Sequence, residues 1–170
     1  MVRSVTSCLA AFLAALSLAP PALAVNRTWN NTGSGDWNNG TFWTPSGNPS
    51  TVDNTAINNG GTAQVTGTAN SDVVTVGTNG GDSGTITVNG ASAVLNGSNG
   101  LNLGQGGTGT MSLTNGGRFT TNGAINVGNL AGSNGTLTVD GPNSKATGTV
   151  TTIGNAGTGV LNITSAAPGR

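Results

Sequence analysis

The sequence predicts an all-β fold: a three-sided parallel β-helix of about 25 residues per turn, with a tryptophan-rich N-terminal cap. Two observations carry this prediction: a repeat with two glycine markers, and alternation of apolar and polar residues beside each marker. A third supports it. After the N-terminal segment, glycine and β-branched residues dominate, and no stretch repeats its apolar residues about every 3.6 positions, as a helix would.

The repeat extends from Val73 to Thr164. A first short strand ends in glycine, at positions 27, 24 and 26 residues apart: Gly77, Gly104, Gly128 and Gly154. A second strand begins with glycine, at positions 25, 26 and 24 residues apart: Gly84, Gly109, Gly135 and Gly159. Two independent markers that keep one period indicate a solenoid or an array of repeats.

Alternation gives each of these strands one apolar face, because residues two apart point the same way. In the second strand the apolar pairs are Ile86/Val88, Met111/Leu113, Leu137/Val139 and Leu161/Ile163. In the first they are Val74/Val76, Leu101/Leu103 and Ile125/Val127. Copies stacked at about 4.8 Å would form continuous aliphatic columns. An antiparallel sandwich is the alternative fold, and the constant spacing of equivalent strands favours the coil.

Each unit has room for a third strand. The candidates are Ala93–Leu95, Arg118–Thr121 and Lys145–Thr147, each preceded by an Asn-Gly or Asp-Gly turn. Residues 60–72 form a degenerate first repeat, in which we expect a strand at Ala63–Thr66 and a turn at Asn70–Asp72.

The N-terminal residues 1–24 have the pattern of a secretory signal peptide. Arg3 precedes an apolar run over residues 9–18, and Ala22-Leu23-Ala24 forms a small-x-small cleavage site before Val25. The apolar run is shorter than the roughly 20 residues that a membrane span needs, which favours cleavage over anchoring. Cys8, the one cysteine, lies inside this segment, so the mature chain would have no thiol and no membrane span.

Residues 25–59 contain all three tryptophans: Trp29, Trp37 and Trp43. The first coil of a solenoid has no neighbour on one side, so its end residues are atypical. We therefore interpret this segment as a cap, and a sugar-stacking platform of Trp rings is the alternative. Residues 60–170 are the predicted solenoid. Their end at Ala166–Arg170 has no polar cap, which predicts a truncated part of a longer protein.

The repeat unit resembles a known family. Ile125–Gly128, the spacer Ala131–Asn134 and Gly135–Gly141 resemble the repeats of bacterial autotransporter (type V secretion) passenger domains and of secreted proteins with a PEP-CTERM sorting tail. The opening residues are similar to the start of such passengers: Trp37, Trp43, Pro49, Asp53 and Ile57. The resemblance implies a right-handed β-helix that is secreted or held at the bacterial cell surface, on the outer membrane.

The charged residues offer little chemistry. The formal net charge is zero, and the basic residues Arg27, Arg118, Lys145 and Arg170 are isolated along the chain, which argues against a nucleic-acid partner. Among the acids of the mature chain, only Asp72 and Asp82 are candidates to meet in space as a catalytic pair. No His is present. Asn79–Asp82 comes closest to a calcium loop but occurs once and favours a plain turn.

We therefore expect no catalytic, cofactor or metal site, and no enzyme. The favoured interpretation is a non-catalytic, adhesin-like surface rod. Its partners would be host surfaces, glycans or other copies of itself. The alternative is a carbohydrate-binding or carbohydrate-active β-helix protein.

Overall fold

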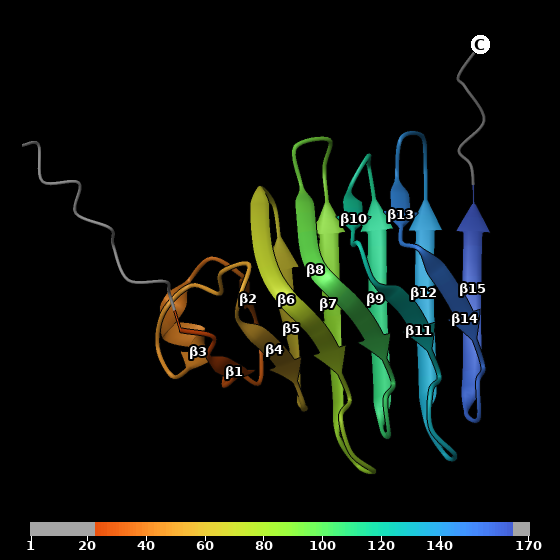
Figure 1. The fold of residues 1–170 in the computed structure, drawn as a ribbon. Helices are drawn as coiled ribbons and strands as arrows, with labels where there is room; N and C mark the ends of the chain where they lie inside the picture. The colour runs from red at the N-terminus through yellow and green to blue at the C-terminus, as the bar shows by residue number, and fades with distance from the viewer. Residues whose placement is uncertain (1–22, 165–170) are drawn as a thin grey trace, which may run out of the picture.

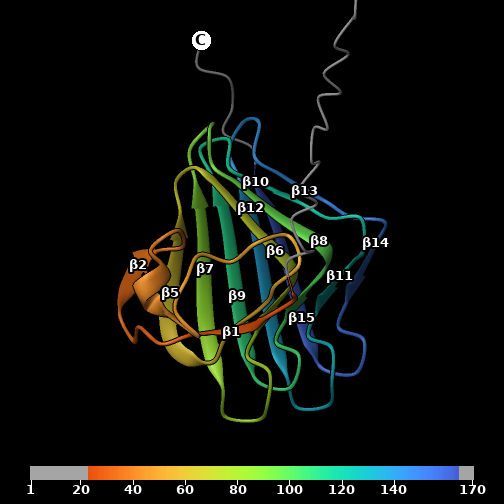
Figure 2. The same cartoon turned by 60° about the vertical axis from the view of Figure 1, so that its left-hand side comes forward.

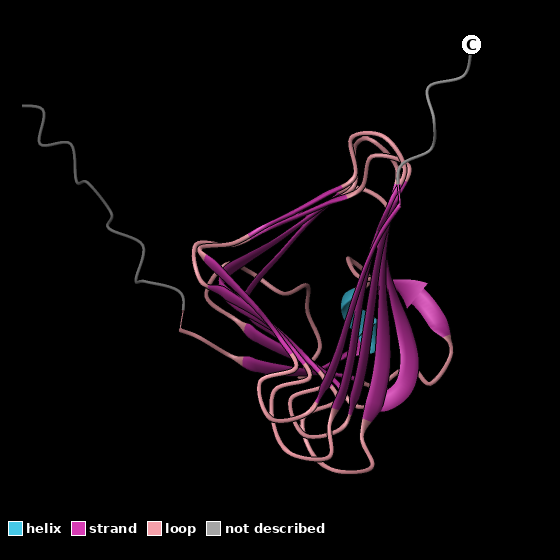
Figure 3. Ribbon diagram, turned by 90° about the vertical axis from the view of Figure 1, so that its right-hand side faces the viewer, coloured by secondary structure: helices cyan, strands magenta, loops and turns pink. Residues whose placement is uncertain are grey.

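The computed structural model describes residues 23–164. The chain winds into a single coil, and the end-on view shows its three sides (Figure 3). Within the coil, every strand pairs in parallel with its equivalent in the next turn. The predicted three-sided parallel coil is therefore confirmed, and the antiparallel sandwich is excluded. Residues 1–22 of the predicted signal peptide (residues 1–24), Cys8 among them, and residues 165–170 lie outside the described part.

One side is a six-stranded sheet, which we call the six-stranded side. It receives one strand from each turn, so the described chain makes six turns (Figure 1). Its strands are β2 (Ser34–Asp36), β5 (Asn59–Val65), β7 (Ser83–Asn89), β9 (Thr108–Thr114), β12 (Asn134–Asp140) and β15 (Thr158–Thr164). The register aligns Ile86, Met111, Leu137 and Leu161, as the repeat predicted.

The other two sides belong to one nine-stranded sheet. In the earlier turns, one long strand covers both sides: β6 (Thr68–Val76) and β8 (Val94–Leu103). In later turns, the chain is divided between β10 (Arg118–Thr120) and β11 (Ala124–Val127), and then between β13 (Lys145–Thr147) and β14 (Val150–Ile153). We name the two sides the β10 side and the β11 side. The third strand expected in each unit forms the β10 side.

The turn predicted at Asn70–Asp72 was wrong. These residues lie inside β6, where the pairing with β8 shifts register between Ser71 and Val73. A shift of this kind bends a strand without ending it. The corner between the β10 and β11 sides is therefore made here by a bend, and no separate turn is needed.

The interior is filled by columns of like side chains. Ile86, Met111 and Leu137 are at most 1% exposed and lie directly above one another. On the β10 side, Phe119 stacks beside Leu95 and is fully buried. Each fully buried aliphatic side chain contributes about 1.5–3 kcal/mol, so the stability of one turn depends on the turns beside it.

The two glycine markers keep the same period because they touch. Gly128 has φ of +73°, a conformation that other residues rarely adopt, and its N–H donates to the Leu103 carbonyl at 2.8 Å. Gly135 lies against this hydrogen bond: a Cβ on it would come within 2.3 Å of both Gly128 N and Leu103 O. Gly109 and Gly159 stand in the same relation to Gly104 and Gly154.

The N-terminal segment lies across one end of the coil (Figure 2), and its aromatic side chains belong to the buried core. Trp29, Trp37 and Trp43 are at most 1% exposed, and Trp43 makes edge-on contacts with both of the others. Trp43 Nε1 also donates to the Trp37 carbonyl at 2.8 Å. The elements here are β1 (Asn26–Trp29), a 3₁₀ turn η1 (Gly40–Phe42), β3 (Trp43–Thr44) and β4 (Asn54–Ile57). Because β1 and β2 pair in parallel with β4 and β5, both sheets continue into this segment.

Candidate functional site

Polar side chains form ladders along the outside of the coil. Asn126 donates to Asn102 at 3.0 Å on the β11 side. On the β10 side, Thr120 donates to Asn96 at 2.8 Å, and Asn96 donates to Asn70 at 3.1 Å. Register forces this arrangement, because identical positions of successive turns are neighbours on the surface. The ladders hold amide and hydroxyl groups in fixed rows.

The β10 side carries a polar hollow of about 280 Å³. Its lining consists of amides and hydroxyls: Asn96, Ser98, Thr120, Thr121, Asn122 and Thr147. The lining contains no titratable group, so it offers hydrogen-bond donors and acceptors but no acid or base. Such a surface is suited to a ligand rich in hydroxyl groups.

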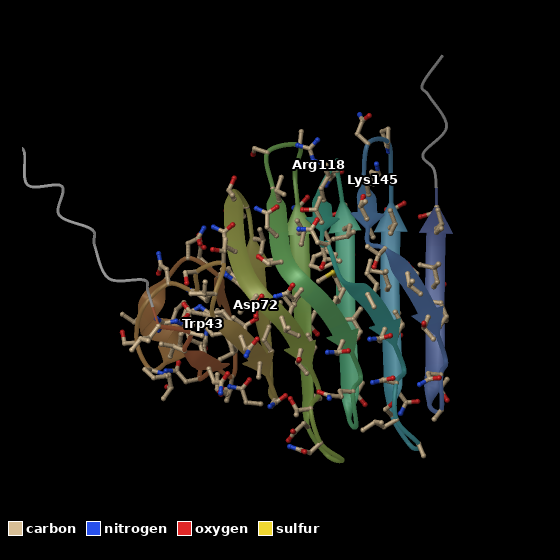
Figure 4. The ribbon with its side chains drawn as sticks, viewed as in Figure 1. Trp43, Asp72, Arg118 and Lys145 are labelled. Carbon is tan, nitrogen blue, oxygen red and sulfur yellow. The ribbon has the colours of Figure 1, made fainter. Side chains whose placement is uncertain are left out.

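Two cations lie on the strands that contribute Thr120 and Thr147 to this hollow. Arg118 and Lys145 are isolated from one another along the chain, but the fold makes them register partners on β10 and β13 (Figure 4). Both are exposed, and each lies two residues before a threonine of the hollow, Thr120 and Thr147, on the same face of its strand. Each is the first residue of the third strand of its repeat, and this shared position is the sequence signal that would have revealed the pair.

The two candidate carboxylates do not meet. Asp72 lies in β6 and accepts a hydrogen bond from Asn99, whereas Asp82 lies in the loop before β7 and accepts from the Asn79 backbone at 2.9 Å. Between them runs the extended segment Val73–Val76, about 13 Å long at the usual rise per residue. Each carboxylate accepts a hydrogen bond in a different corner of the coil, so Asp72 and Asp82 do not form a catalytic pair.

The loop Asn79–Asp82 closes on itself. The Asp82 carboxylate accepts from both the backbone and the side chain of Asn79, at 2.9 and 3.1 Å. This is the geometry of a plain turn, which the sequence favoured over a calcium loop. Within residues 23–164 no group of three or more His, Cys, Asp or Glu side chains comes close enough to hold a metal ion.

The tryptophans are not available to a sugar. Trp37 and Trp43 are 0% and 1% exposed, and the ring of each packs against another indole. A stacking platform needs an open ring face, so the sugar-platform interpretation of these residues was wrong. The contacts that bury the rings are those of a core.

A second hollow, also of about 280 Å³, opens at the last described coil. Its lining is the interior column itself, with Leu137, Val139, Leu161 and Ile163 among the residues. Leu161 and Ile163 are 39% and 71% exposed although they continue buried columns. This hollow is the end of the described core, and the polar residues of its lining are Ser144, Lys145 and Thr151.

Comparison with known proteins gives no identification: no family model, no curated protein and no solved structure matches this chain. In the described part of the chain, no helix has the length and apolar character required to cross a bilayer. The site therefore has to be interpreted from its own geometry.

Proposed function

We propose that this chain is a non-catalytic, exported β-solenoid that acts as an adhesin-like segment at the bacterial surface, as the autotransporter resemblance implies. The observation that carries the proposal is the polar hollow on the β10 side, with Arg118 and Lys145 paired on two of the strands that line it. The lining of this hollow offers hydrogen-bond donors and acceptors and contains no acid or base. The parallel ladder supports the proposal further, because it keeps these groups at fixed spacing.

The ligand class follows from the groups on this surface. Hydroxyls and amides bind the hydroxyl groups of a sugar, and two neighbouring cations favour a carboxylate or sulfate on it. We therefore propose an acidic polysaccharide as the partner. The sparse charge of the chain fits the same partner better than nucleic acid, which needs a longer basic stripe.

The test is a binding assay with a uronate-rich polysaccharide, using the chain from Val25 onward. The double variant R118A/K145A removes both cations and should weaken binding at least tenfold. The matched control is T110D/T136D, which changes net charge by the same amount on the outer face of the six-stranded side. Equal loss in both double variants would mean that only overall charge matters and would contradict the proposed site.

The catalytic alternative has its own readout. The purified chain is incubated with the same polysaccharide, and new reducing ends or unsaturated products are measured over time. The proposal expects none above a heat-denatured sample. Product formation that disappears in D72N or D82N would contradict the non-catalytic assignment and favour a carbohydrate-active enzyme.

A further inference from the structure

The best-enclosed charge in the structure is the carboxylate of Asp53, which is 3% exposed at the N-terminal end of the coil. One oxygen, Oδ2, accepts from Arg27 Nε at 3.1 Å and from the backbone N–H and hydroxyl of Ser50, both at 2.9 Å. The other oxygen, Oδ1, accepts from the Val25 backbone nitrogen at 2.8 Å. Among the described residues, the Val25 nitrogen is the only hydrogen-bond donor to Asp53 Oδ1.

Val25 is also the residue at which the sequence predicts signal-peptide cleavage. The two residues before it, Leu23 and Ala24, are exposed, Leu23 by 85%, and β1 begins directly after it at Asn26. The scissile Ala24–Val25 bond therefore lies outside the packed cap, while its nitrogen faces a buried anion. Two unrelated observations, a processing motif and a buried carboxylate, coincide at one atom.

We propose that Asp53 is the receptor for the mature N-terminus. Hydrolysis of the Ala24–Val25 bond by a signal peptidase adds water across it: Ala24 takes the hydroxyl as a new carboxyl group, and the Val25 nitrogen takes the hydrogen. That amine binds one further proton at neutral pH, and the resulting α-ammonium forms an ion pair with Asp53 Oδ1. The inference rests on the export that the proposed function assumes.

The charge balance explains why this matters. Among the described residues, Arg27 is the one cation on Asp53, and its guanidinium is shared, because Nη1 also donates to the Pro45 and Ser46 carbonyls at 2.8 and 3.2 Å. After cleavage, a neutral N–H donor on Oδ1 becomes a charged one, and charge-assisted hydrogen bonds are about twice as strong as neutral ones. Removal of the signal peptide would therefore stabilise the N-terminal cap.

The experiment compares two chains that differ at this atom: one that begins at Val25, and one that retains Leu23 and Ala24. Both carry Lys145→Arg, which removes the one lysine and leaves the α-amine as the sole primary amine. The free Val25 chain should melt about 3 °C or more above the extended chain. Acetylation of Val25 should remove that gain. Equal melting temperatures would overturn the proposal.

A second readout remains decisive if a variant fails to fold. The pairing holds the proton on the α-amine, so acylation of folded Val25 at pH 8 should be about tenfold slower than acylation of a Val-Asn-Arg peptide. Asp53→Asn should restore the peptide rate and abolish the difference in melting temperature. A peptide-like rate in the unmutated chain would overturn the proposal.

Failure of the proposed export is seen separately. The intact mass of the exported protein reports which bond is cleaved, and cleavage at any bond other than Ala24–Val25 overturns the receptor role. Polysaccharide binding by the chain from Val25 onward tests the adhesin proposal independently of both results.

Discussion

The two ends of the described coil differ sharply, although the same columns of side chains reach both. At the N-terminal end, Trp29, Trp37 and Trp43 close the interior and are almost fully buried. At the other end, Leu161 and Ile163 are 39% and 71% exposed, yet they occupy the same register as the buried Leu137 and the half-buried Val139. Burial in this fold is therefore decided by the presence of a neighbouring turn on each side, and an end turn needs larger side chains or a partner.

The largest expected effect comes from placing a charge at equivalent positions in an inner and an outer turn. Leu137→Asp puts an unpaired carboxylate into a column that is 1% exposed and should unfold the coil, at a cost of about 4 kcal/mol or more. Leu161→Asp, its register partner in the last turn, should cost about 1 kcal/mol. Far-UV circular dichroism during thermal melting measures both. Similar losses would contradict the contrast between inner and end turns.

Removing a large side chain from each end is the next test. Trp43→Ala empties the centre of the aromatic cluster and should destabilise the chain by about 3–5 kcal/mol. Ile163→Ala, at the open end, should cost less than about 1 kcal/mol because its side chain is mostly exposed. Urea unfolding gives both values. A small effect of Trp43→Ala would mean that the cap does not stabilise the coil.

Glycine substitutions test whether the corner packing is as tight as the marker period indicates. Gly135→Ala would place a Cβ within 2.3 Å of the Gly128 nitrogen and should cost about 2 kcal/mol or more. Gly80→Ala makes the same change in the unfolded chain but meets nothing within 4 Å, so it should be neutral or slightly stabilising. The difference between the two melting temperatures isolates the corner contact, and no difference would contradict it.

Acid should weaken the closed end selectively. Burial by itself raises the pKa of Asp53, but hydrogen bonds from the Ser50 backbone and side chain, Val25 and Arg27 outweigh it and hold the pKa below the usual 3.8. A lowered folded pKa contributes stability that is present above the unfolded value and lost as pH falls through the folded value. The unmutated chain should therefore lose more stability than Asp53→Asn below about pH 4.

The quantity to measure is the difference in stability loss between the unmutated chain and Asp53→Asn. The other acids, Asp36, Asp72, Asp82 and Asp140, are present in both and cancel. Hydrogen exchange at low pH should show the first loss of protection in β1 and β4, next to Asp53, with β12 still protected. Parallel loss in both regions would contradict a local effect of Asp53.

The fold could be predicted because its information is local and repeated. Alternation at Ile86/Val88 and the glycines at Gly128 and Gly135 define the inward face and the corner of each unit, and copying them along the chain defines the register. The bend at Ser71–Val73 could not be predicted, because a strand that turns a corner by a register shift contains no turn residue.

The candidate site was harder to predict, since its residues belong to different turns. Arg118 and Lys145 are 27 positions apart and become neighbours only when the units are superposed. The Asp53 network joins Val25 and Arg27 to Ser50 in the one segment that does not repeat, so no periodicity points to it. Burial of the tryptophan rings was equally invisible, because an aromatic residue suits a core and a binding face alike.

Gly109, Gly135 and Gly159 are aligned in successive turns. This alignment has a consequence for how the length of such a chain can evolve. A tandem duplication of residues 109–134 would insert one whole coil, adding a layer to every side without altering any existing contact pattern. The rod would lengthen by about one strand spacing, near 4.8 Å, and the N-terminal cap would be unchanged. The length of the rod can therefore change with the number of repeats, while the contacts within each turn stay the same.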